Sequence, residues 1–268
     1  DCGGDRDHDK YRVHVRGLFP KAGLLDDKEG WRRMFSEKWI NAFFATDAKD
    51  AKLTAPYIGV DVGGEGSDSS EIYGRDALLA RHLFSEGTST PESVAKLTIK
   101  SIEITEAEPR DVSIDNFGVG ADVSAKIALL SDKDMFVQGV NVGMKCEDPD
   151  DRKVYFNERA RLADMLLKWG IQGGRCVADQ KLAVELESIY CKEEAGGKLQ
   201  IMPKKKMREL GLKSPNHFDA LALTFAQDTA FAMRVPRGDH LYYPDRPEEE
   251  KTKEAVSNQN RHRMISFI

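Results

Sequence analysis

Three aspartates occupy positions from which a carboxylate could take part in chemistry. Asp61 ends a short apolar run, Asp115 ends a second strand-like run, and Asp219 lies in the first turn of a late Ala- and Leu-rich helix. An ionised carboxylate beside a sheet interior costs free energy unless it is hydrogen-bonded or holds a cation. Each acid also has an ordinary interpretation, because Asp is common in turns and at helix starts.

Taken together, the three acids predict a site for divalent metal ions. Two adjacent strand ends and one helix start can converge on one edge of a sheet. Hydrolysis of a phosphodiester with two hard cations about 4 Å apart requires shared carboxylate ligands. Mg²⁺ takes few protein carboxylates and keeps waters that a phosphate can displace.

The elements that must hold these acids predict an α/β domain. Residues 57–60 indicate a buried strand, which a Gly-rich turn joins to a second strand at 70–73 as an antiparallel hairpin. A strand at 112–114, a helix at 122–130 and a strand at 136–142 predict a βαβ unit with parallel strands. Further helix signals lie at 28–45, 91–100, 157–169, 179–190 and 219–234, the last with Ser214 as N-cap.

Composition and charge narrow the class of protein. Hydrophobic residues make up 40% of the chain and charged residues 32%, which is typical of a soluble globular protein. No apolar run approaches the length that spans a bilayer, so we expect no membrane partner. The net charge of −5 does not favour nucleic-acid binding, although a carboxylate site adds negative charge by construction. The four cysteines lack zinc spacing, and we expect them to be reduced and mostly buried.

Four segments carry a resemblance to a known family. They read GVDVGGEGSD, VSIDNFGVGADV, FNERARLADMLLKWG and GLKSPNHFDALALTFA. In this order they resemble the nuclease domain of the large terminase subunits of tailed phages, over about residues 11–234. The most specific element is SPNHFDALALTFA, followed by the glycines after the second acid. The opening DHDKYRVHVRGLFP resembles the segment that closes the ATPase domain of this family.

The resemblance implies a ribonuclease H-like α/β fold with a mixed five-stranded sheet flanked by helices. Asp61, Asp115 and Asp219 match the metal-binding triad of the family, which would hold two Mg²⁺ or Mn²⁺ ions. Asp68 matches an acid that recurs in the first hairpin of the family and would be a further ligand. Many members have Asp where this chain has Asn216, so we do not expect a strong ligand at that position.

The implied domain organisation has three parts. Residues 1–50 would be the end of the ATPase domain and a linker, 51–235 the nuclease domain, and 236–268 a flexible C-terminal tail. No GxxxxGK[ST] phosphate loop occurs, and the chain begins with Asp1. We therefore expect the ATPase motor in sequence that is absent here.

The implied function is metal-dependent endonuclease activity on double-stranded concatemeric viral DNA during genome packaging, in the cytoplasm of the host cell. Water would be the nucleophile, and sequence specificity would be low because no recognition helix is evident. The expected partners are double-stranded DNA, the portal protein, the small terminase subunit and the ATPase domain of the same polypeptide. Two alternatives remain: a Holliday-junction resolvase or transposase-like nuclease of the same fold, and a non-catalytic docking module of the packaging motor.

Basic residues near the acids have competing interpretations. Lys204, Lys205 and Lys206 could contact DNA phosphates, or they could belong to a solvated loop. Arg159 and Arg161 are expected as charges on a helix surface. His217 is expected as an exposed residue in the first turn of the last helix, with a role as a metal ligand as the less favoured alternative.

Overall fold

The computed structural model describes residues 29–45, 48, 50–63, 68–87, 89–116, 118–131, 135–194 and 196–228. Of the expected ATPase end and linker at 1–50, residues 1–28 lie outside this range, as does the expected tail at 236–268. Within it, no helix has the length and apolar character needed to cross a lipid bilayer. Cys146, Cys176 and Cys191 are free and buried, as predicted.

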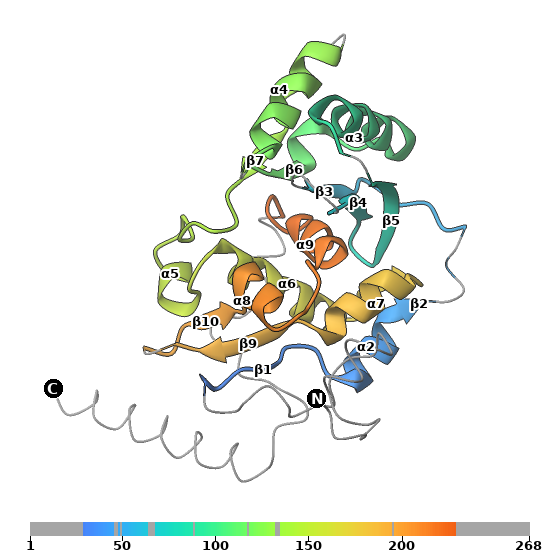
Figure 1. The fold of residues 1–268 in the computed structure, drawn as a ribbon. Helices are drawn as coiled ribbons and strands as arrows, with labels where there is room; N and C mark the ends of the chain where they lie inside the picture. The colour runs from blue at the N-terminus through green and yellow to red at the C-terminus, as the bar shows by residue number, and fades with distance from the viewer. Residues whose placement is uncertain are drawn as a thin grey trace, which may run out of the picture. The chain divides into compact units, whose positions relative to one another are not determined.

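A seven-stranded sheet is the framework of the described chain (Figure 1). Its strand order is β2-β8-β5-β4-β3-β6-β7. The strands are β2 (Phe44–Ala45), β3 (Tyr57–Asp61), β4 (Ser70–Arg75), β5 (Leu79–Glu86), β6 (Val112–Asp115), β7 (Gln138–Val140) and β8 (Arg175–Val177). β4 is antiparallel to both β3 and β5, and the other neighbouring strands are parallel. The predicted mixed α/β sheet is confirmed, with seven strands instead of five, and the short β2 and β7 form its two edges.

The β3–β4 hairpin divides its residues between the two faces of the sheet. Successive side chains of a strand alternate in direction, and directly opposed antiparallel residues share a face. Asp61 opposes Glu71, and Gly59 opposes Tyr73, so these four residues lie on the same face. The apolar residues between them face the other way and build a core with two helices, α3 (Pro91–Thr105) and α4 (Gly120–Leu130).

Helix α9 (Asn216–Leu223) packs against the polar face of this hairpin, between the sheet and helices α6 (Glu158–Ile171) and α7 (Gln180–Glu187) (Figure 1). Gly59 permits the close approach, since a Cβ atom there would lie 2.1 Å from the carbonyl oxygen of Ala220. A helix backbone therefore lies directly on β3, which brings the first turn of α9 next to the end of that strand.

A buried arginine fixes the end of α9 to the hairpin. The Arg75 guanidinium donates hydrogen bonds to Thr224 Oγ1 and to the Thr224 carbonyl oxygen, both at 3.0 Å, and to Asp228 Oδ2 at 2.8 Å. It also lies 3.8 Å from the centre of the Phe225 ring. Because the arginine is almost fully buried, its charge requires all of these partners.

The remaining elements complete the layer below α9. They are the three-stranded sheet β1 (Arg32–Arg33), β9 (Tyr190–Glu193) and β10 (Leu199–Ile201), and the short helices α2 (Glu37–Phe43), α5 (Asp151–Val154) and α8 (Lys204–Glu209). The helix predicted over 28–45 is confined to α2, because Ser36 caps α2 and β1 precedes it.

The start of α9 differs from the sequence expectation. Its N-cap position holds Pro215, not Ser214, and no side chain of that residue caps the helix. The carboxylate of Glu185, on α7, accepts a hydrogen bond from the backbone N–H of Phe218 at 2.8 Å. A residue distant in sequence thus satisfies one of the open N–H groups at the helix start, which local pattern reading cannot detect.

Candidate metal centre

Two of the predicted acids, Asp61 and Asp219, face the same point. Asp61 is the last residue of β3, Asp219 lies in the first turn of α9, and both are buried. The ammonium of Lys204, at the start of α8, lies 2.9 Å from Asp219 Oδ2 and 3.5 Å from Asp61 Oδ1. The two carboxylates therefore already share one cation.

Asp115 lies beside them at the end of the neighbouring strand. It directly follows Ile114, which pairs in parallel register with Val60. Gly120 at the start of α4 makes room for this strand end, because a Cβ atom there would lie 1.7 Å from the Asp115 carbonyl oxygen. Asp115 is half-buried, and its negative charge helps to raise the pKa of Asp61. The ends of β3 and β6 thus lie side by side, while the role of the three acids as metal ligands stays a prediction.

The electrostatics of the two buried acids differ. Burial, together with the charges of Asp219 and Asp115, raises the pKa of Asp61 to about 7 against the lowering effect of Lys204. Burial also acts to raise the pKa of Asp219, but Arg159 and Lys204 outweigh it and lower that pKa overall. Asp61 therefore ionises less readily than Asp219. A divalent cation would favour the ionised form of each acid.

Arg159 is the site residue that sequence reasoning missed. Its Nε lies 2.8 Å from Asp219 Oδ1 and its Nη2 3.3 Å from Oδ2, while Nη1 donates to the Met202 carbonyl oxygen at 3.0 Å. The expectation of a helix-surface charge is wrong for this residue, which is buried. The available signal was periodicity: Leu162 and Leu166 follow at helical spacing, so Arg159 belongs to the buried face of α6.

The three candidate lysines have different surroundings. They open the helix α8 instead of forming a loop. Lys204 contacts the acids, Lys205 is exposed, and Lys206 pairs with Glu29 with its ammonium 5.7 Å from the Trp31 ring centre. The Lys204 ammonium therefore pairs with the carboxylates instead of extending into solvent.

Asp68 lies just before β4 in the hairpin, and Asn216 begins α9. Asp68 is half-buried, and its carbonyl oxygen would lie only 2.3 Å from a Cβ atom built on Gly63. Its role as a metal ligand stays a prediction. Asn216 donates a side-chain hydrogen bond to the Ser69 carbonyl oxygen at 2.9 Å, which ties α9 to the same turn.

The donor set suits a hard divalent cation. Three carboxylates come from β3, β6 and α9, and carboxylate oxygens are the ligands that Mg²⁺ and Mn²⁺ prefer. The Lys204 ammonium marks a position where two of these carboxylates stabilise a positive charge.

Comparison with known proteins gives sequence and fold relatives. No protein-family model matches the chain. The chain is 26% identical over 268 residues to a probable terminase large subunit of Enterobacteria phage P7, an alignment that covers 95% of this chain and 50% of the relative. The chain thus spans about half the length of this curated relative.

Two solved nuclease domains have the same fold. The nuclease domain of the large terminase subunit of bacterial virus Sf6 aligns with a TM-score of 0.58 and 22% identity, over 71% of this chain and 97% of that domain. The large terminase nuclease of thermophilic phage G20c aligns with a TM-score of 0.53 and 15% identity, over 73% and 98%. The Sf6 domain is also known, as a mutant, with manganese, at a TM-score of 0.55 and 21% identity over 71% and 97%.

These findings confirm the expected fold and the expected resemblance. The mixed sheet with its flanking helices is the ribonuclease H-like fold of terminase nuclease domains. The chain is similar in sequence to a terminase large subunit and has the fold of the large terminase nuclease domain.

Proposed function

We propose that this chain is the nuclease part of a terminase large subunit and that it cleaves double-stranded concatemeric viral DNA during genome packaging. One observation carries the proposal: Asp61 and Asp219 converge on a single cation, with Asp115 next to them. Such a set of carboxylates is what metal-dependent hydrolysis of a phosphodiester requires. The solved Sf6 domain with manganese supports the choice of Mg²⁺ or Mn²⁺ as cofactor.

Asp61, Asp115 and Asp219 would hold two such ions, with Asp68 as a further ligand. Bound divalent ions supply Lewis acidity, which polarises the phosphate and lowers the pKa of water. Arg159 holds the Asp219 carboxylate through two nitrogens, so this ligand is oriented before any ion arrives. Lys204 keeps the carboxylates close together in the absence of metal by offsetting their mutual repulsion.

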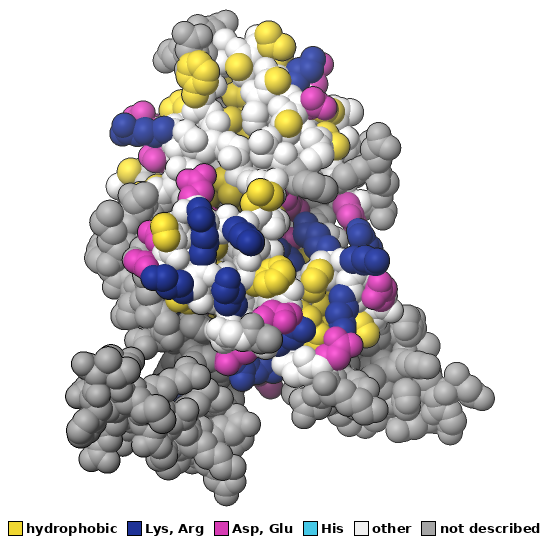
Figure 2. All heavy atoms as spheres, turned by 90° about the vertical axis from the view of Figure 1, so that its left-hand side faces the viewer, with side chains coloured by type: hydrophobic (Ala, Val, Ile, Leu, Met, Phe, Trp, Pro, Cys, Tyr) yellow, Lys and Arg dark blue, Asp and Glu magenta, His cyan; other side chains and the backbone are white. Residues whose placement is uncertain are grey.

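DNA would be held mainly through its phosphates. Lys204, Lys205 and Lys206 begin α8 beside the acids, and Lys205 is exposed. Figure 2 shows Lys and Arg side chains gathered across the middle of one face, interleaved with Asp and Glu side chains. Mixed charge of this kind favours weak contacts without base reading, and binding should therefore fall steeply with salt.

The other expected partners follow from the same proposal. The ATPase domain would belong to the same polypeptide, which the 50% coverage of the phage P7 relative supports. The portal protein and the small terminase subunit would join it in the host cytoplasm, where packaging takes place.

Incubation of the purified protein with supercoiled plasmid tests the proposal. We expect nicked and linear products with Mg²⁺ or Mn²⁺, little product with Ca²⁺, and none with EDTA. Ca²⁺ coordinates more loosely and does not impose the geometry of in-line attack. Absence of cleavage with every ion would favour the alternative of a docking module.

A second substrate separates the proposed nuclease from a resolvase of the same fold. We expect linear duplex and four-way junction DNA to be cut at similar rates per length of duplex. Strong preference for the junction, with paired symmetric cuts, would contradict the packaging role and support the resolvase alternative.

A further inference from the structure

The proposed nuclease reaction makes no use of a second cluster of metal-ligating side chains. Glu71, His82 and His217 each place one ligand atom within 4.8 Å of the other two. They come from the consecutive strands β4 and β5 and from α9, which is distant from both in sequence. His217 is buried, contrary to the sequence expectation, and its ring centre lies 5.1 Å from that of His82.

The distances in this cluster suit a small metal ion. Glu71 Oε2 lies 2.8 Å from His82 Nε2, and Glu71 Oε1 lies 3.3 Å from His217 Nε2. Ligand atoms bound at 2.0–2.1 Å to a tetrahedral zinc ion lie roughly 3.3 Å apart. Small side-chain movements would therefore convert the cluster into a coordination shell.

The surroundings of His217 orient one ring nitrogen toward the cluster. The Tyr73 hydroxyl donates to Asp179 Oδ2 at 2.5 Å, so its oxygen can accept a hydrogen bond from His217 Nδ1 at 3.0 Å. In a neutral ring, Nε2 then carries a lone pair and faces a carboxylate oxygen of Glu71. Two acceptors that face each other require a proton or a cation between them. Hydrogen bonding of the other ring nitrogen toward a carboxylate also accompanies histidines that bind metals.

Glu71 is held as an oriented anion. Its carboxylate is fully buried and accepts hydrogen bonds from Ser69 Oγ at 2.6 Å and Ser85 Oγ at 2.9 Å. The two serine hydroxyls fix the orientation of the carboxylate, so the cluster offers a positioned oxygen ligand at its base.

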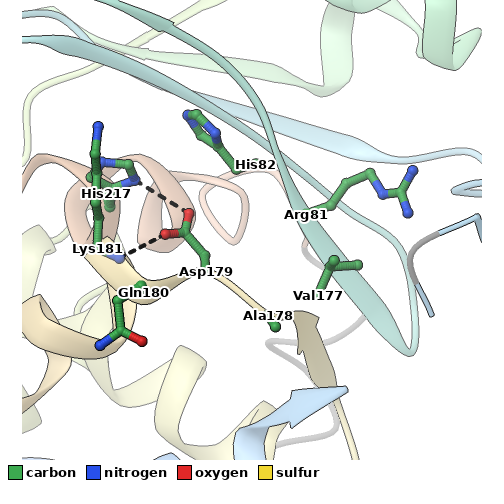
Figure 3. A pocket seen from close by; sticks show the side chains of 8 residues that line it. All are labelled: Arg81, His82, Val177, Ala178, Asp179, Gln180, Lys181 and His217. Atoms are coloured by element: carbon green, nitrogen blue, oxygen red, sulfur yellow. Dashed lines mark hydrogen bonds and ion pairs between the residues drawn. The ribbon is translucent and has the colours of Figure 1, made fainter. Parts of the chain in front are cut away.

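A cavity gives access to the cluster. Its volume is about 520 Å³, and His82, His217 and Asp179 are among the residues that line it. Figure 3 shows both imidazole rings among the lining side chains, with the Asp179 carboxylate next to His217. An ion could enter from this side and keep a water as its fourth ligand.

We propose that Glu71, His82 and His217 bind one zinc-type transition-metal ion, with a fourth coordination position open to the cavity. Two imidazoles and one carboxylate favour Zn²⁺, Co²⁺ or Ni²⁺ over Mg²⁺, which prefers oxygen ligands only. The ion would connect β4 and β5 to α9, two residues before Asp219. This site does not depend on the nuclease activity proposed above.

Calorimetric titration of the metal-free protein with Zn²⁺ tests the proposal, with three variants. His82→Gln removes a ligand whose side chain is 28% exposed, and it should weaken zinc binding at one site at least tenfold. Arg81→Gln, at a neighbouring residue that lines the same cavity, should bind zinc like the parent. Asp115→Asn should also bind zinc like the parent, which would show that this site is distinct from the one formed by the three aspartates.

Cobalt gives a readout on the parent protein without any variant. Co²⁺ bound by two imidazoles in four-coordinate geometry should give intense visible absorption, whereas an octahedral oxygen site gives weak absorption. Zinc should also raise the melting temperature of the parent but not that of His82→Gln. Weak cobalt absorption in the parent, or unchanged zinc affinity in His82→Gln, would show that protons and not a metal ion hold this cluster together.

Discussion

Lys204 and Asp219 form an ion pair at the centre of the candidate site, with Nζ 2.9 Å from Oδ2. Burial acts to lower the pKa of Lys204, but the charges of Asp219 and Asp61 raise it overall. The lysine therefore stays protonated at neutral pH, close to where a metal ion would bind the same oxygens. Metal binding and this ion pair compete for Asp219.

Removal of this competitor should strengthen metal binding. In Lys204→Ala, we expect Mn²⁺ to bind at least about tenfold more tightly, which corresponds to about 1.4 kcal/mol. The metal-free variant should melt at a lower temperature, because two buried carboxylates lose their shared cation. Calorimetric Mn²⁺ titration and thermal melting measure both effects. Lys205→Ala, at an exposed position on the same helix, is the control, and equal Mn²⁺ affinity of the two variants would refute the competition.

Arg159 should be required for positioning Asp219. Lysine at this position keeps the charge but cannot donate through two nitrogens of a planar group. We expect Arg159→Lys to lose about 1.5–3 kcal/mol of stability, the size of a hydrogen bond to a charged group. Plasmid nicking should fall at least tenfold.

The matched control is Arg161→Lys, on the same helix, where the arginine pairs with Glu158. It should cut plasmid at close to the parental rate. If Arg159→Lys nicks DNA as fast as this control, the contact with Asp219 has no part in positioning the site.

Glu185 should make the metal-free protein less stable at alkaline pH. Burial raises its pKa from about 4.5 to about 9, and the nearby Asp219 and Asp61 charges add to the shift. Between these values the folded state binds more protons than the unfolded state, so stability falls as pH rises from about 4.5 to 9. Glu185→Gln keeps an acceptor for the Phe218 N–H and removes the titration.

We expect Glu185→Gln to match the parent at pH near 5 and to exceed it by about 1 kcal/mol or more at pH near 8.5, from chemical denaturation in EDTA. Glu187→Gln, on the same helix, serves as control. A parent and Glu185→Gln variant with parallel pH profiles would show that this carboxyl is ionised in the folded protein at neutral pH.

The residues that end strands could be predicted from sequence, because neighbouring residues in the chain determine where a strand ends. Asp61 and Asp115 each follow a run of apolar residues, and a parallel βαβ unit brings such strand ends to one edge. The hairpin between Tyr57 and Arg75 was likewise evident from its turn glycines. Three helices begin after a residue whose side chain accepts hydrogen bonds from backbone N–H groups of the first turn. These N-cap residues are Thr90, Asn157 and Asp179.

Contacts between distant segments could not be predicted in this way. Arg159 and Lys204 approach Asp219 only because α6, α8 and α9 pack together. The Glu71, His82 and His217 cluster depends on strand register and on the close fit of α9 to Gly59. Periodicity indicates which face of a helix is buried, but it does not indicate which residue lies opposite.

The most direct measurement of the central claim compares plasmid nicking by the parent, Asp115→Asn and Asp122→Asn in Mn²⁺. Asp115 is half-buried at the end of β6, and Asp122 is an exposed acid in the first turn of α4, so both variants should fold like the parent. We predict that Asp115→Asn loses nearly all Mn²⁺-dependent cleavage and much of any metal-induced rise in melting temperature, whereas Asp122→Asn keeps both. Cleavage by Asp115→Asn at the parental rate would show that Asp115 is a structural residue and that the proposed metal centre is wrong.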